Sequence, residues 1–173
     1  MIAIDSGQLG VSPLVEGSIQ PASIELHLGN SFKQMKLSRF PIDLLNPHIE
    51  YDEYEIKDNT RIKIEPGGFF LAHTKETVRI PNGTVARVEG KSSLGRFGLA
   101  IHVTAGYVDP GFEGEITLEI VNLSLNALLL TPGMKIAQLC VMQMTSEASE
   151  PYGHPKFKSH YQGQTGATAS RIT

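Results

Sequence analysis

The chain has 173 residues, of which 40% are hydrophobic and 19% are charged, and its formal net charge is −3. This composition predicts a single globular domain over residues 1–173 and excludes a disordered chain. No long basic run is present, so we expect no nucleic-acid partner. No segment has the apolar length of a membrane span, and the N-terminus lacks the features of a secretory signal. We therefore expect a cytoplasmic protein without a membrane partner.

Short segments in which apolar and polar residues alternate recur along the chain, and this period is typical of half-buried β-strands. In the segment 23–29, SIELHLG, the alternation predicts that Glu25 and His27 lie on the face opposite the apolar residues. Further strands are expected at residues 61–64, 84–90 and 115–123, and in the two apolar runs that flank the Pro-Gly turn at 132–133. The second of these runs has the pattern of a strand buried on both faces. Many short strands between turns predict a β-sandwich, a jelly roll or a distorted barrel.

Helix is expected only in short pieces. Residues 1–9 are compatible with a helical fragment, and SSLGRFGL could begin a short helix capped by Ser92 or Ser93. The tail from about 146 to 173 is rich in Gly, Ser and Thr, and by composition alone it would be flexible.

The segment GKSSLGR, residues 90–96, combines small residues and hydroxyls with two flanking cations. These are the groups of a phosphate-binding loop, although the spacing of a Walker loop is absent. An ordinary helix start is the alternative.

Three single residues have both a functional and a structural interpretation. Asp109 could bind a sugar hydroxyl or orient a water, but Asp-Pro-Gly is also common turn chemistry. Glu119 could be a general acid/base on a rigid strand or a solvated carboxylate. His102 could be a base or a packed side chain. In the tail, Tyr152 and Gln164 could lie on the surface or belong to a lid.

A protein-bound metal is not expected. The single cysteine, Cys140, is too few for a thiolate zinc site and is expected to be buried, and the six histidines lack metal-ligand spacing.

Five segments together resemble the successive motifs of the dCTP deaminase family within the dUTPase-like superfamily. They are QPASIELHLGNSF, GKSSLGRFGL, HVTAGYVDPGFEGEITLEIVN, PGMKIAQL and YQGQTGATASR, and they follow the family's order over residues 20–171. The resemblance implies a distorted β-barrel or jelly roll with minor helices. It also implies a homotrimer with active sites shared between subunits, and a tail over about 146–173 that closes over the active site.

The resemblance assigns catalysis to four residues. Glu119 would act as base and then acid, Ser92 would hold the attacking water together with the backbone near Ala105, Arg96 would stabilise charge near Glu119, and Asp109 would approach the deoxyribose. The implied substrate-binding residues are Lys91, Ser92, Ser93, Leu94, Gly95, Arg96, Asp109, Thr117, Leu118, Glu119, Gln138, Tyr152, His160 and Gln164.

The implied reaction is hydrolytic deamination of dCTP at C4. Zinc deaminases carry H-x-E with P-C-x-x-C, which one cysteine cannot supply, so a carboxylate would have to activate the water. Magnesium would bind through the triphosphate of the substrate and not through a protein cage.

Members of the family release either dUTP or, after a second hydrolysis, dUMP and diphosphate. The pair Gly106-Tyr107 in TAGYVDPGF resembles the dUMP-forming type, in which Asp109 would also orient the water that attacks the α-phosphorus. The alternatives are a deaminase that releases dUTP, a dUTPase, and a non-catalytic nucleotide-binding regulator. The family also implies inhibition by dTTP through the loop of His102, Val103, Thr104 and Ala105.

Overall fold

The structure is a computed structural model and describes residues 9–57 and 60–171. The expected helical fragment at 1–9 lies, apart from Leu9, outside these residues. The elements in chain order are β1 Gly10–Ser12, β2 Ile24–His27, β3 Ser31–Met35, β4 Tyr51–Glu55, β5 Ile62–Ile64, β6 Phe69–Arg79, β7 Thr84–Gly90, α1 Ser92–Gly95, β8 Leu99–Ala100, β9 Tyr107–Val108, β10 Glu113–Asn122, β11 Leu128–Leu130, β12 Lys135–Gln143 and the 3₁₀-helix η1 Pro155–Phe157.

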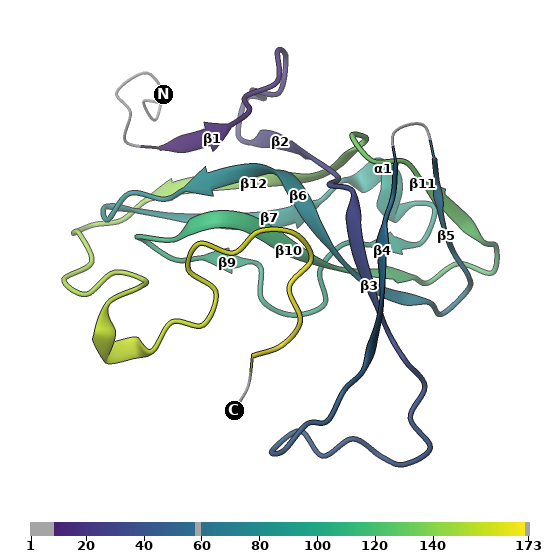
Figure 1. Ribbon diagram of the computed structural model, residues 1–173. Helices are drawn as coiled ribbons and strands as arrows, with labels where there is room; N and C mark the ends of the chain where they lie inside the picture. Colours follow the sequence, from purple (N-terminus) through teal and green to yellow (C-terminus); the bar gives the residue numbers. More distant parts are fainter. Residues whose placement is uncertain (1–8, 58–59, 172–173) are drawn as a thin grey trace.

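The strands form three antiparallel sheets (Figure 1). The largest has the order β4-β3-β6-β10-β8, with β1 also paired to β6, and the second has the order β2-β12-β7-β9. Strands β11 and β5 form a separate pair. The predicted all-β fold with short helices is therefore confirmed, in a distorted arrangement whose sheets do not close into a continuous barrel.

One hydrophobic cluster fills the space between the sheets. Its fully buried side chains come from both large sheets, for example Leu26 of β2, Leu118 and Ile120 of β10, and Leu139 of β12. The expected strands at 84–90, 115–123 and on both sides of the Pro-Gly turn are all present.

The burial of two strands differs from the prediction. All four residues of β2 are buried, including Glu25 and His27, which the alternation placed on a polar face. Strand β12 is less buried than predicted, because its C-terminal half is partly exposed and Cys140 is only half-buried. Charged partners explain why Glu25 and His27 of β2 can be buried. His27 Nδ1 lies 2.6 Å from Glu76 Oε1, and Glu25 contacts two lysines.

The short helix α1 is present, but its predicted cap is wrong. Lys91 occupies the N-cap position, and no side chain caps the helix. The backbone carbonyl of Lys91 instead accepts hydrogen bonds from Leu94 N and Gly95 N. Ser92 and Ser93 belong to the helix and are exposed, so their hydroxyl groups point away from the core.

Two long segments lie outside the sheets. Residues 36–50, which we call the arm, connect β3 to β4 and extend well beyond the sheets in Figure 1. The tail, residues 146–171, returns to lie along β10, where Glu115 N donates to Gln164 O and Gly163 N donates to Glu113 O. Composition alone predicted a flexible tail, whereas the structure holds it by hydrogen bonds from both its backbone and its side chains.

Candidate functional site

Three pockets of the described residues contain predicted site residues. The largest of these three has a volume of about 580 Å³, and we call it the carboxylate pocket. Its lining residues come from the arm and the adjoining ends of β3 and β4, from β6, β9 and β10, and from the tail. Its lining residues are Met35, Leu44, Pro47, Ile49, Tyr51, Phe69, Leu71, Ala105, Tyr107, Val108, Asp109, Phe112, Ile116, Thr117, Glu119, Tyr152, Tyr161, Gln164, Thr168 and Ser170.

Glu119 lies on β10, opposite Leu71 of the central strand β6, and its side chain is half-buried. Its Oε2 accepts a hydrogen bond from Val103 N at 2.8 Å and a second from Thr104 N at 3.3 Å. Oε1 takes part in neither bond. The loop that precedes β9 therefore fixes the carboxylate, and a rigid strand carries it, as a general acid/base requires.

Asp109 lies at the exposed end of β9 in the turn that leads to β10. Phe112 N donates to its backbone carbonyl at 3.1 Å, so Asp109 has the turn role that its sequence indicated, while its side chain also lines the carboxylate pocket. Gly106 is buried, and a Cβ there would lie 3.1 Å from Val88 O. The close approach of two backbones thus favours glycine at this position.

Arg87 is a residue of this region that the sequence analysis did not identify. Its guanidinium carbon lies 5.6 Å from the centroid of the Tyr107 ring, and its Nε lies 2.6 Å from Glu89 Oε1. Tyr107 lines the carboxylate pocket, so Arg87 of β7 supports the ring from the neighbouring strand by a cation–π contact. A residue twenty positions away on another strand gives no local signal in the sequence.

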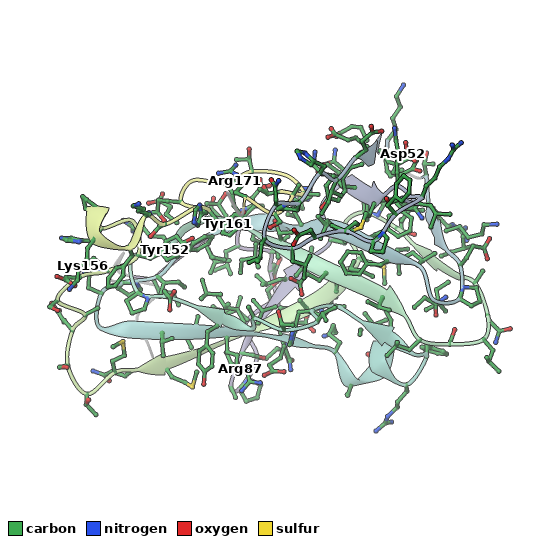
Figure 2. The ribbon with its side chains drawn as sticks, turned by 90° about the horizontal axis from the view of Figure 1, so that it is seen from below. Asp52, Arg87, Tyr152, Lys156, Tyr161 and Arg171 are labelled. Carbon is green, nitrogen blue, oxygen red and sulfur yellow. The ribbon has the colours of Figure 1, made fainter. Side chains whose placement is uncertain are left out.

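The tail brings its aromatic residues to the same pocket. Tyr152 Oη accepts a hydrogen bond from Tyr161 N at 3.1 Å, and burial raises the pKa of the Tyr152 phenol above its ordinary value. Arg171 lies beside Tyr161 (Figure 2), with its guanidinium carbon 5.9 Å from the ring centroid and its Nη1 donating to His160 O at 2.6 Å. Sequence reasoning also missed Arg171.

Gln164 is buried in the wall of this pocket. Its Nε2 donates to Glu115 O at 2.8 Å, and its own backbone carbonyl accepts from Glu115 N at 3.0 Å. These two bonds join the tail to β10.

The second pocket has a volume of about 450 Å³ and surrounds the GKSSLGR segment; we call it the loop pocket. Its lining residues are Gly90, Lys91, Ser92, Ser93, Gly95, Leu99, Ala100, Ile101, His102 and Gln138. Gln138 of β12 is paired in register with Glu89 of β7 and Glu25 of β2, so the floor of this pocket is a continuous sheet.

The structure divides the predicted site residues between these pockets. Asp109, Thr117, Glu119, Tyr152 and Gln164 line the carboxylate pocket, and Lys91, Ser92, Ser93, Gly95 and Gln138 line the loop pocket. Leu118 belongs to the core, and Leu94 packs against it. Arg96 is exposed and lines neither pocket. His160 lines a third pocket of about 410 Å³, which Asp109 and Tyr152 also line.

The charges of the two pockets are complementary. Asp109 and Glu119 line the carboxylate pocket, and no Lys, Arg or His among the described residues does. Lys91 lines the loop pocket, where the part of the chain that the structure describes places no Asp or Glu. A nucleoside triphosphate needs cations and hydroxyls for its phosphates and, for acid/base chemistry, a carboxylate at its base. Each pocket therefore supplies half of such a site.

Over residues 9–57 and 60–171, no group of three or more His, Cys, Asp or Glu side chains is arranged to hold a metal ion. Among the same residues, no helix has both the length and the apolar character that crossing a membrane requires.

Comparisons with known proteins identify related sequences over nearly the whole chain. Residues 2–144 match the family described as dCTP deaminase-like. A protein of Streptomyces coelicolor named dCTP deaminase, dUMP-forming, is 43% identical over 97% of this chain and 89% of its own length. Proteins of the same name from Methanosphaera stadtmanae and Methanobrevibacter smithii are 42% and 44% identical over 98% of the chain.

Solved structures agree on the fold. The 2′-deoxycytidine 5′-triphosphate deaminase of Agrobacterium tumefaciens superposes with a TM-score of 0.60 at 20% identity, covering 79% of this chain and 44% of that one. The chain thus spans less than half the length of that protein. A dUTPase of Staphylococcus bacteriophage 80alpha superposes with a TM-score of 0.51 at 15% identity, covering 82% of this chain and 94% of that one. From the family match and the close relatives together, this chain belongs to the dCTP deaminase-like family.

Proposed function

We propose that this chain deaminates dCTP at C4 and then hydrolyses the α–β phosphoanhydride, releasing dUMP, diphosphate and ammonia. The observation that carries the proposal is the placement of Glu119, a half-buried strand carboxylate held by two loop amides inside a pocket of nucleotide size. Relatives more than 40% identical over almost the whole chain are named dCTP deaminase, dUMP-forming, which supports the same activity.

In the first step, Glu119 accepts a proton from a water molecule while the oxygen of this water adds to C4 of cytosine. The carboxyl group then returns this proton to N3, and the second proton of the attacking water goes to the exocyclic amino group. The C4–N4 bond breaks, ammonia leaves, and a carbonyl forms at C4. One carboxylate can serve as base and then acid because it carries the same proton between steps.

In the second step, a second water attacks the α-phosphorus and diphosphate departs, so that two waters are consumed for each dCTP. Asp109 is the exposed carboxylate of the pocket, and we assign it the orientation of this water. Magnesium would be bound through the phosphates of the substrate, where it would supply positive charge against the charge of the leaving diphosphate. The ring of Tyr107 lines this end of the pocket, and we assign to Gly106 the close backbone approach that positions Tyr107.

We further propose that the working enzyme is a homotrimer in which the loop pocket of one copy faces the carboxylate pocket of the next. The complementary charges of the two pockets support this arrangement. Ser92 and Arg96 would then act on a nucleotide bound beside Glu119 of the adjoining copy. The tail would act as a lid, with Tyr152, His160 and Gln164 closing over the substrate.

Regulation by dTTP would act on the same carboxylate. The loop of residues 102–105 already donates two amides to Glu119, so a shift of Thr104 and Ala105 would change the space for the catalytic water.

The test is to incubate the protein with dCTP and magnesium and to separate the nucleotides by anion exchange. We expect dUMP and diphosphate without free dUTP, and we expect Glu119→Gln to lose ammonia release while it still binds dCTP. Accumulation of dUTP would leave deamination standing and contradict the second hydrolysis. Unchanged dCTP, together with turnover of added dUTP, would identify a dUTPase instead.

A further inference from the structure

The structure assigns to Glu25 a role as a positioning residue that holds two lysines, Lys91 and Lys135, as a joint binding point for the phosphates of the substrate. This inference rests on the proposed function. It adds Lys135 to the phosphate-binding groups and names the residue that orients Lys91.

Glu25 is a carboxylate in a buried environment. It lies in the middle of β2, where its side chain is only 9% exposed. A buried carboxylate is costly unless it is paired. Here each oxygen has its own cation, because Oε1 lies 2.5 Å from Lys91 Nζ and Oε2 contacts Lys135 Nζ. The hydrogen bonds from Lys135 and Lys91 lower the pKa of Glu25 in spite of its burial.

The two lysines come from different elements. Lys91 lies between β7 and α1 and lines the loop pocket, and Lys135 begins β12. Three residues further along β12, Gln138 lies opposite Glu25 in the register of β2 and lines the same pocket. Glu25 and Gln138 are therefore neighbours across two strands, Lys135 comes from the same strand as Gln138, and Lys91 reaches Glu25 from the residue that follows β7.

Two ammonium groups on one carboxylate leave a net positive charge in this cluster, and Lys91 of the cluster lines the loop pocket. An ammonium group has three N–H donors, so one bond to Glu25 leaves donors on each lysine for phosphate oxygens. Lys135 is half-exposed and Lys91 is more buried, so a phosphate can approach the pair from the solvent side. Because Glu25 already holds both flexible lysine side chains in place, binding a phosphate causes a smaller loss of side-chain entropy.

Glu25 is not a catalytic residue under this assignment, because it touches lysines and not substrate. Its replacement should therefore change KM and leave kcat nearly unchanged. We expect Glu25→Gln and Lys135→Ala each to raise the KM for dCTP about tenfold, since each removes or misplaces one charge-assisted phosphate contact. Glu25→Asp keeps the charge and should recover part of the affinity.

Two small molecules, tested as inhibitors of the active enzyme, distinguish this positioning role of Glu25 from a purely structural one. Inorganic tripolyphosphate carries only the phosphates, and deoxycytidine carries only the nucleoside. We expect the inhibition constant of tripolyphosphate to rise about tenfold in Glu25→Gln and in Lys135→Ala. The constant of deoxycytidine should stay unchanged. Equal losses for both inhibitors, or no loss for tripolyphosphate, would overturn the assignment.

The matched control is Lys63→Ala. Lys63 is an exposed lysine on β5 whose Nζ lies 2.6 Å from Glu65 Oε1, so the variant removes the same charge and the same kind of ion pair elsewhere. The Lys63→Ala variant should turn over dCTP like the parent, and tripolyphosphate should inhibit both equally.

If Glu25→Gln does not fold, the Lys135→Ala variant still decides the question, because the side chain of Lys135 is half-exposed. Failure of the parent to deaminate dCTP would contradict the proposed function, whereas unchanged tripolyphosphate inhibition in active variants contradicts only this inference.

Discussion

At the scale of single residues, a histidine explains why position 29 is a glycine. A Cβ on Gly29 would lie 2.1 Å from Nε2 of the buried His73. That imidazole cannot move aside freely, because Ser31 N donates to Nε2 at 3.2 Å and Nδ1 lies 2.7 Å from Glu115 Oε2. Since Nε2 accepts a hydrogen bond, the proton of a neutral ring lies on Nδ1 and faces Glu115.

Gly29→Ala should therefore destabilise the fold by about 1–3 kcal/mol, the usual cost of overpacking a filled site. Chemical denaturation measures this loss. Gly83→Ala is the control, because its nearest atom beyond the chain neighbours, Glu147 Cγ, would lie 3.5 Å from the new Cβ. If contact with the ring is the cause, Gly29→Ala will cost less in a His73→Ala background. An equal cost in both backgrounds would point to the backbone instead.

The buried polar residues of β2 are where the sequence prediction failed. Alternation identifies which side chains share a face, but it does not tell whether a second layer covers the polar face. Glu25 and His27 are covered, and each is compensated by a partner more than forty positions away in sequence. The alternation of apolar and polar residues within one segment holds no information on such distant pairs.

The pH dependence of stability provides a test of the lysine pairing at Glu25. Because its folded-state pKa is lowered from the ordinary value of 4.5, the folded chain keeps Glu25 ionised to lower pH than the unfolded chain does. Its stabilising contribution is therefore present above pH 4.5 and is lost as pH falls through the lowered value. The difference in unfolding free energy between the parent and Glu25→Gln should be largest near about pH 7 and shrink toward about pH 3. A difference that stays constant with pH would exclude the ion pairs as its source.

At the scale of elements, β10 organises the site. Leu118 and Ile120 of β10 enter the core, Thr117 and Glu119 line the carboxylate pocket, and Glu115 binds the tail. The sequence predicted this strand correctly, because its apolar and polar residues alternate from Glu115 to Ile120. The ladder to β6 shifts between Glu115 and Thr117, and Ile116 N donates to Thr74 Oγ1 there, which no local pattern indicated.

The tail was the element that composition described least well. Its Gly, Ser and Thr residues suggested flexibility, but those small residues let its backbone approach β10 and β3 closely. Gly166 N donates to Glu115 Oε2 at 2.6 Å, Ala167 N donates to Ser31 Oγ at 2.9 Å, and Thr168 N donates to Thr117 Oγ1 at 3.3 Å. Each bond uses a tail amide as donor, a group that every residue except proline has, so the composition does not reveal the contact.

Glu115→Ala should loosen this attachment. It removes the acceptor of the Gly166 amide and the partner of His73, so opening of the tail should become easier by about 1–3 kcal/mol. We expect faster tryptic cleavage at the exposed Lys156 and Lys158, and a KM that rises more than kcat falls.

Glu113→Ala is the matched control for this change, because Glu113 is an exposed carboxylate on the same strand whose contact with the tail uses its backbone carbonyl. Equal cleavage rates in both variants would show that Glu115 does not hold the tail.

At the scale of the whole molecule, the division of the predicted site between two pockets is the main feature that local sequence patterns do not predict, although the family resemblance implies active sites shared between subunits. The motifs follow one another closely in the chain, since only residues 97–118 separate Arg96 from Glu119. The fold nevertheless places GKSSLGR in one pocket and Glu119 in another. Closeness in sequence was therefore a poor guide, because strands β8 and β9 and the loop between them carry the chain from one pocket to the other.

If one site uses Glu119 from one copy and Arg96 from the next, two inactive variants can restore each other. We expect Glu119→Gln and Arg96→Ala each to lose deamination and each to keep the fold, since the first is isosteric and the second alters an exposed side chain. After the two are unfolded together and refolded as an equal mixture, a quarter of the sites in a cyclic assembly would combine an intact Glu119 with an intact Arg96. Activity should recover to about a quarter of the parent value.

The same variants refolded separately and assayed at once after mixing provide the control, because copies can combine in one assembly only if they exchange after mixing. Recovery that depends on joint refolding assigns the two residues to different copies of the chain. Persistent inactivity after joint refolding, with assemblies of the parent size, would place both residues of each site in one copy. The complementary charges of the two pockets would then need another partner, because each of them alone provides only half of the groups that a nucleoside triphosphate requires.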